Sequence, residues 1–131
     1  MIQNTGMEIR ATVGKIPLLS KFIGNSMLKF DLGEYIQFQV QIAVEELINN
    51  IIKCGKLNEN DKISVKCQKE DKEIKIYIKY PGESFNPTIA NSSSLKEKKD
   101  CLNVYFTRKN INKINHKFDD GKNILTLIKH V

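Results

Sequence analysis

Polar side chains form a narrow line along the longest periodic segment of the chain, residues 34–54. Apolar residues recur there at helical spacing, and at about 100° per residue the polar stripe holds Gln39, Glu46, Asn50 and Lys53. Apolar sectors border this stripe on both sides, whereas the solvent face of most amphipathic helices is broad and rich in charge. A carboxylate, an amide and an amine along so thin a line are typical of the wall of a polar pocket. Helical geometry alone also allows Glu46 to lie at the surface.

The segments around this helix predict a two-layer arrangement. Alternating or short apolar runs indicate strands, and apolar residues at spacings of three and four indicate helices. We expect strands at 7–13, 62–69, 74–80, 116–118 and 123–129, and helices at 16–30, 34–54 and 102–114. Helices that cover one face of a mixed, mostly antiparallel sheet make an α+β two-layer sandwich.

Length and composition indicate one ordinary globular domain, residues 1–131. Hydrophobic residues make up 40% and charged residues 27% of the chain, and its apolar runs are too short for a membrane helix. The N-terminus lacks the pattern of a signal peptide. Cys54, Cys67 and Cys101 are odd in number and widely spaced, which argues against a disulfide framework and a zinc site. We therefore expect a protein of the reducing cytoplasm.

The net charge of +6 comes from 21 Lys and Arg residues against 15 Asp and Glu residues. Such an excess favours acidic partners, although a lysine-rich composition without functional meaning explains it more simply. The chain has no arginine cluster, zinc-finger spacing or aromatic RNA-binding motif. Nucleic acid is therefore a disfavoured partner.

Residues 81–100 differ in composition from the rest of the chain. This stretch begins with Pro81-Gly82, contains Ser92-Ser93-Ser94 and ends in a run rich in lysine. It is too long for an ordinary connection, and loops of this kind usually have a function or move. We expect it to be a mobile lid over a neighbouring site, and docking of a partner is the alternative use.

The order of motifs resembles the ATPase domains of the histidine-kinase-like (GHKL) superfamily, whose structure is called the Bergerat fold. It is similar in particular to their small anti-sigma-factor serine kinases. The acidic–x–x–x–Asn box of that family is matched by Glu46-Leu47-Ile48-Asn49-Asn50, and its strand-end motif by Tyr80 to Pro87 except at the first position. Thr107-Arg108 and Thr126-Leu127-Ile128-Lys129 match the end of the domain. The resemblance covers residues 7–130.

The resemblance implies a role for each polar residue of the long helix. Glu46 would be the general base that takes the proton from a serine hydroxyl of the protein substrate. Asn50 would be a ligand of the Mg²⁺ ion that accompanies ATP, since Mg²⁺ prefers oxygen ligands. Lys53 would add positive charge near the phosphates.

The resemblance also implies contacts to the nucleotide from outside this helix. Gly82 would let the backbone pass close to the adenine, because glycine has no Cβ. Phe85 would anchor the start of the lid, and Thr126 would lie near the adenine edge on the sheet.

Three positions depart from the family pattern. Tyr80 replaces the aspartate that accepts a hydrogen bond from the adenine amino group, and its ring could fill the adenine slot. Cys101 and Asn103 replace two glycines that let backbone N–H groups surround the phosphates. Two interpretations follow: a kinase that binds Mg-ATP and phosphorylates its partner, or a degenerate module that regulates by binding alone. In both, the partner would be a sigma factor or an anti-sigma antagonist, and a homodimer is possible.

Overall fold

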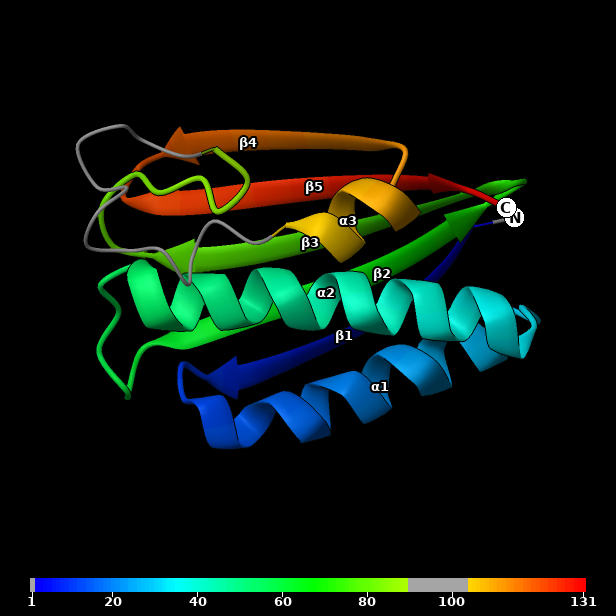
Figure 1. The fold of residues 1–131 in the computed structure, drawn as a ribbon, viewed down its shortest axis with the longest axis horizontal. Coiled ribbons are helices and arrows are strands. Elements are labelled where there is room, and N and C mark those ends of the chain that lie inside the picture. The colour runs from blue at the N-terminus through cyan, green and yellow to red at the C-terminus, as the bar shows by residue number, and fades with distance from the viewer. Residues whose placement is uncertain (1, 90–103) are drawn as a thin grey trace.

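The computed structural model describes residues 2–89 and 104–131. Within these ranges one sheet and a set of helices pack face to face (Figure 1). No helix in the described residues is long and apolar enough to cross a membrane.

The sheet has the strand order β1-β2-β3-β5-β4, and the four pairings among the described residues are antiparallel. The strands are β1 (Ile2–Arg10), β2 (Lys62–Glu70), β3 (Glu73–Pro81), β4 (Lys113–Asp119) and β5 (Lys122–His130). The turn between β4 and β5 is Asp120-Gly121, and both residues have positive φ (51° and 72°). A two-residue hairpin turn of this type requires that conformation, and Asp-Gly adopts it readily.

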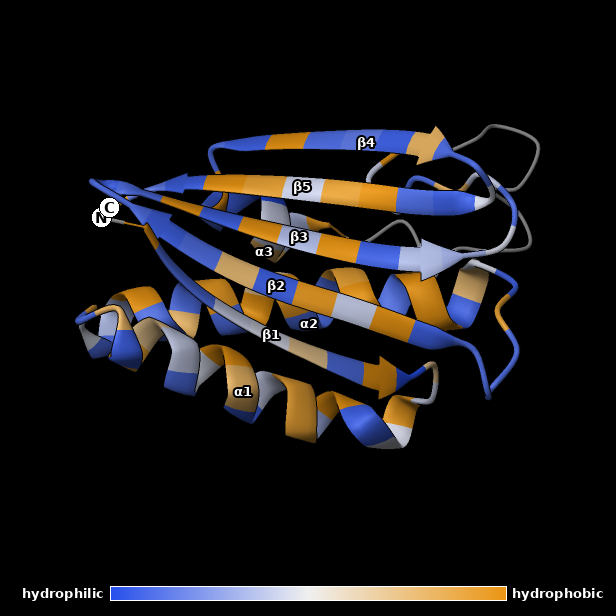
Figure 2. Ribbon diagram, turned by 180° about the vertical axis from the view of Figure 1, so that it is seen from behind, coloured by the Kyte–Doolittle hydropathy of each residue, from blue (hydrophilic) through white to orange (hydrophobic). Residues whose placement is uncertain are grey.

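The helices lie on one face of the sheet and leave the other face open (Figures 1 and 2). They are η1 (Val13–Lys15), α1 (Ile16–Lys29), α2 (Glu34–Cys54) and α3 (Tyr105–Asn110). Pro17 lies in the first turn of α1, where its missing N–H costs no helical bond. The α2 helix ends at Cys54 and is capped by Gly55, whose N–H donates to the carbonyl of Ile51.

The core lies between the helices and alternate residues of each strand. In β3 the buried residues are Ile74, Ile76, Ile78 and Tyr80, which gives the period of two expected of a half-buried strand. The α2 helix buries Val40, Ala43, Val44, Leu47, Ile48 and Ile51 against them. Because only one face of the sheet is covered, its other face carries mostly polar side chains.

The two-layer fold predicted from the sequence is confirmed, while several element bounds are wrong. The first strand begins at Ile2 and ends at Arg10, so residues 11–13 are not part of it. The helix expected at 102–114 is described only from Tyr105 to Asn110. Ile114 lies instead in β4, where it pairs with Leu127. Backbone pairing and side-chain packing against β5 outweigh the weak helical pattern of this segment.

The cysteines also depart from expectation. Cys54 is disulfide-bonded, contrary to the expectation of free thiols. Cys67 is free and fully buried in β2, and this burial raises the pKa of its thiol to about 12.

Candidate functional site

The carboxylate of Glu46 caps the N-terminus of α3. Its Oε1 accepts hydrogen bonds from the backbone N–H of Thr107 (2.9 Å) and from the Thr107 hydroxyl (2.8 Å). Its Oε2 accepts one from the N–H of Phe106 (3.1 Å). The residue before α3 is Val104, which has no polar side chain to serve as a cap. Glu46 therefore supplies from α2 both the acceptors and the negative charge that a helix N-terminus favours.

Lys129 holds the opposite end of α3. Its Nζ donates to the carbonyl of Asn110, the last residue of the helix, at 2.6 Å. The Lys129 side chain is buried, and this burial lowers the pKa of its ammonium group. A helix of six residues is too short to be stable alone. Charged side chains from α2 and β5 thus hold α3 at its two ends, each with the sign that complements the helix dipole.

Asn50 and Lys53 continue the polar line of Glu46 toward the end of α2. Asn50 is 2% exposed, whereas Lys53 is exposed in the last turn. The loop after β3 comes close to this end of the helix, because a Cβ placed on Gly82 would lie 3.9 Å from the carbonyl oxygen of Gly55. Gly82 has a φ of 105°, a conformation that residues with a side chain rarely adopt. The structure thus brings the end of the stripe and the Gly82 loop together.

Tyr80 is almost completely buried at the end of β3. It is 1% exposed, and its hydroxyl donates to the carbonyl of Phe85 at 2.5 Å. Burial raises the pKa of the Tyr80 phenol above its ordinary value. The group is therefore a neutral donor within the core, and it draws the loop back toward the sheet at Phe85.

Asn123 on β5 is the second anchor of this loop. Its Oδ1 accepts from the N–H of Phe85 (2.9 Å), and its Nδ2 donates to the carbonyl of Glu83 (3.0 Å). The Nε2 of His116 lies 2.8 Å from the same Oδ1. Since Oδ1 can only accept, Nε2 is the ring nitrogen that carries a proton in this contact. Asn123 is fully buried, so the loop after β3 has a fixed polar attachment to the sheet.

Thr126 does not belong to this cluster. It lies three residues after Asn123 on β5 and pairs with Tyr77, on the face of the sheet opposite the helices. An odd number of residues along a strand reverses the direction of the side chain. We expected Thr126 and Gly82 to meet at the adenine, but the structure does not place Thr126 beside the Gly82 loop. Asn123 lies there instead.

Sequence reasoning assigned no site role to three residues that build this region, which are Thr107, Asn123 and His116. Period-two alternation from the buried residues of β5 could have found Asn123, because Leu125 and Leu127 share its face. Nothing local marks Thr107 as the partner of Glu46. Cys101 and Asn103, which were expected at the phosphates, lie outside the described residues.

Comparisons with known proteins agree with this fold. The sequence model of the histidine kinase-like ATPase domain matches residues 9–129. The crystal structure of the RsbU and RsbW domains of Rv1364c from Mycobacterium tuberculosis superposes with a TM-score of 0.72 at 10% sequence identity. That match covers 98% of this chain and 32% of the other, so the chain spans about a third of that protein's length. A search of the curated proteins found no match.

The two-layer fold, in which the long helix α2 packs on one face of an antiparallel sheet, is that of a histidine kinase-like ATPase domain. Because the family's sequence model extends over nearly all of the chain, this protein belongs to that family.

Proposed function

We propose that this protein is a regulatory module similar to the anti-sigma-factor kinases, which acts by binding a sigma factor or an antagonist protein and not by transferring phosphate. The observation that carries the proposal is the position of Glu46. By the family resemblance this carboxylate would be the base for the attacking serine. Here both of its oxygens accept hydrogen bonds from α3. A base must accept the proton that it abstracts, and three of the roughly four acceptor positions of this carboxylate already cap α3, two on Oε1 and one on Oε2.

Tyr80 supports the same conclusion at the other end of the site. The family's aspartate would offer a carboxylate to the adenine amino group, whereas Tyr80 offers a hydroxyl that donates to Phe85. Its buried ring also occupies space beside the loop that would contact the base. In this arrangement the described residues do not fit Mg-ATP, and we derive no chemical step through it.

Calorimetric titration with Mg-ATP and Mg-ADP tests the proposal. We expect no binding of either nucleotide tighter than about 1 mM. A dissociation constant in the micromolar range would contradict the degenerate site. Titration of this protein with purified sigma factors and antagonist proteins of the same organism, without nucleotide, tests the binding function. Failure of all of them to bind would contradict it.

Removing the Tyr80 ring tests whether it is the ring that excludes the base. Tyr80→Ala would leave a cavity in the core, and free adenine that enters this cavity would raise the melting temperature of the variant. Wild type, with the ring in place, should show no such rise. An equal response of both proteins to adenine would show that the ring is not the obstacle.

A protein serine kinase is the second candidate, because Glu46 and Asn50 lie one helical turn apart as the family's catalytic pair does. It requires that Glu46 take the serine proton on the remaining lone pair of Oε2, or that the carboxylate leave α3. Phosphate transfer from labelled ATP to a partner serine, lost in Glu46→Gln, would favour this candidate over the binding module.

A further inference from the structure

We propose that the outer edge of β1 and the groove between β1 and α1 bind an extended acidic segment of a partner protein, which adds to the sheet as a strand. The inference rests on the proposed function in one respect, namely that the partner is a protein. It does not depend on Glu46, Asn50 or the Gly82 loop, where the family resemblance would place a nucleotide. Its evidence is an unpaired strand edge, a groove with an apolar floor and a set of lysines.

The first observation is the strand edge. In the described residues β1 pairs only with β2, without a bulge from Ile2 to Arg10. Ala11 follows β1 directly, and its N–H donates to the carbonyl of Asp61 (2.8 Å). These two residues would be the next pair if the β1–β2 register continued past Arg10 and Lys62. In an antiparallel ladder such inward pairs alternate with residues whose backbone groups point outward. Asn4, Gly6 and Glu8 therefore direct their N–H and C=O groups toward the free edge, where a new strand would bond.

The second observation is the groove beside that edge. It has a volume of about 430 Å³ and lies between β1 and α1. Its apolar floor comes from Met7, Leu18 and Phe22, and Leu18 is 49% exposed. A strand added to β1 would direct alternate side chains into this groove, since β1 itself directs Thr5 and Met7 there. One apolar side chain in the middle of the segment would cover the floor.

The charges around the groove select the occupant. Lys21 and Lys29 line it from α1, and no described residue in its lining is acidic. Eight residues of helix span about 12 Å, and four residues of strand span about 13 Å. Carboxylates two positions before and two positions after the central apolar residue would therefore reach the two lysines. A second copy of this chain would instead bring its own Lys21 and Lys29 to the same place, which like-charge repulsion disfavours.

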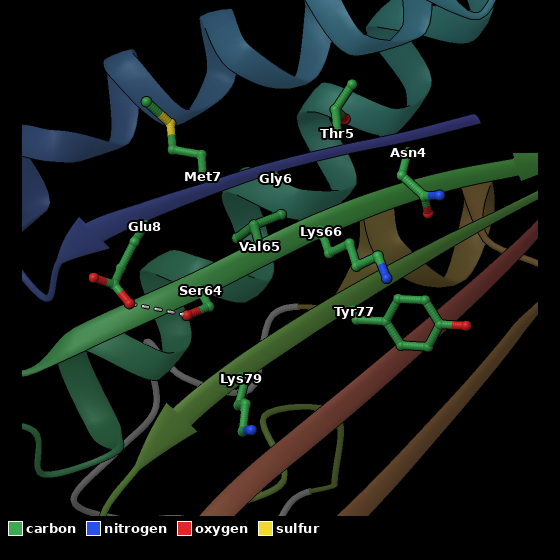
Figure 3. A pocket seen from close by; sticks show the side chains of 10 residues that line it. All are labelled: Asn4, Thr5, Gly6, Met7, Glu8, Ser64, Val65, Lys66, Tyr77 and Lys79. Atoms are coloured by element: carbon green, nitrogen blue, oxygen red, sulfur yellow. Dashed lines mark hydrogen bonds between the residues drawn. The ribbon is translucent and has the colours of Figure 1, made fainter.

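The open face of the sheet adds a third positive group. A hollow of about 760 Å³ lies there, and Figure 3 shows its lining, with Gly6 on β1 and Lys66, Tyr77 and Lys79 on the neighbouring strands. Lys66 is paired with Gly6 across the ladder, and no side chain of Gly6 stands between Lys66 and the free edge. The Lys66 ammonium lies 6.0 Å from the centre of the Tyr77 ring, which holds it over the sheet. An acidic side chain opposite Gly6 would reach this lysine across one strand.

The experiment uses the full-length protein and the peptide acetyl-Thr-Glu-Glu-Leu-Thr-Glu-Thr-amide, which places leucine and two glutamates on the groove side. Titration followed by amide NMR should shift the signals of β1 and α1. The double variant Lys21→Glu/Lys29→Glu should weaken binding about tenfold. The control Lys113→Glu/Lys117→Glu changes the net charge equally but lies on β4, the opposite edge, and should leave binding unchanged. Equal weakening by both variants would show general charge attraction and overturn the proposal.

N-methylated peptides test the backbone pairing. Of the two alternating sets of peptide N–H groups, one faces β1 and the other faces solvent, so methylating one set should abolish binding and methylating the other should not. If both methylated peptides still bind, strand addition is excluded.

Light scattering of the protein alone tests the competing occupant. We expect no dimer that forms through β1. A dimer that protects the β1 amides from exchange without peptide would make a second copy the occupant and overturn the proposal. If a partner protein binds wild type and Lys21→Glu/Lys29→Glu equally well, the groove is wrong but the proposed function stands. If no partner binds wild type, the proposed function fails, whatever the peptide does.

Discussion

Glu46 and Thr107 lie 61 residues apart in the chain and share two hydrogen bonds, at 2.9 Å to the backbone N–H and 2.8 Å to the hydroxyl of Thr107. The same hydroxyl lies 3.1 Å from the carbonyl oxygen of Ala43, one turn earlier in α2. Thr107 is fully buried, so these contacts are shielded from water. They join α3 to the middle of the long helix and engage the carboxylate that the sequence predicts as the acidic residue of the family motif.

A double-mutant cycle measures this link. Glu46→Ala and Thr107→Val should each lower the free energy of unfolding, because each leaves polar groups of the other element without a partner. The coupling free energy between the two sites should be about 1–2 kcal/mol in urea unfolding. Thr107→Ser keeps the hydroxyl and is the control. A coupling near zero would show that the cap does not stabilise the fold.

The buried ammonium of Lys129 supports the other end of α3. Lys129→Met keeps most of the side-chain volume but removes the donor to Asn110, so the C-terminal carbonyl of α3 loses its partner. We expect a loss of about 1 kcal/mol and faster hydrogen exchange at residues 107–110. Lys122→Met, at the exposed start of β5, is the matched control. Unchanged exchange in α3 would contradict the assignment of Lys129 as its cap.

Asn123 and Thr126 make a matched pair on the two faces of β5. Asn123→Ala removes the partner of Phe85 and Glu83 inside the protein, and should cost about 2–4 kcal/mol and open the loop 82–89 to hydrogen exchange. Thr126→Ala on the other face should cost less than about 1 kcal/mol and leave that loop protected. Similar effects of the two substitutions would contradict the anchoring role of Asn123.

Tyr80 makes stability depend on alkaline pH. Its phenol has a pKa above the unfolded value of about 10, so above that pH the unfolded chain loses a proton that the folded protein retains. The stabilisation is complete below about pH 10 and falls by about 1.4 kcal/mol per pH unit above it. Tyr80→Phe should remove this slope, as measured by urea unfolding between pH 9 and 11, conditions chosen to bracket about pH 10. Tyr35→Phe, at a tyrosine that is 73% exposed, should retain it. The same slope in both variants would assign it to another group.

The sequence by itself determined the parts of this protein that depend on local patterns. Strict alternation in residues 74–80 predicts β3, and the spacing of apolar residues in 34–54 predicts α2 with its bounds. The order of helices and strands then limits the architecture to two layers, because each element has one apolar face to bury. The acidic box and the strand-end motif lie on elements that local signals define well. Family and fold were therefore accessible from sequence.

The tertiary structure decided which side chains meet. Glu46 has the spacing of a catalytic residue, and only the packing of α3 against α2 makes it a helix cap. The six residues of α3 carry too little periodicity to mark their own bounds, since their stability comes from Glu46 and Lys129 on other elements. Asn123 and Thr126 differ by three positions in sequence, and the alternation of a strand places them on opposite faces. Contacts between distant segments depend on how whole faces pack, which no local pattern encodes.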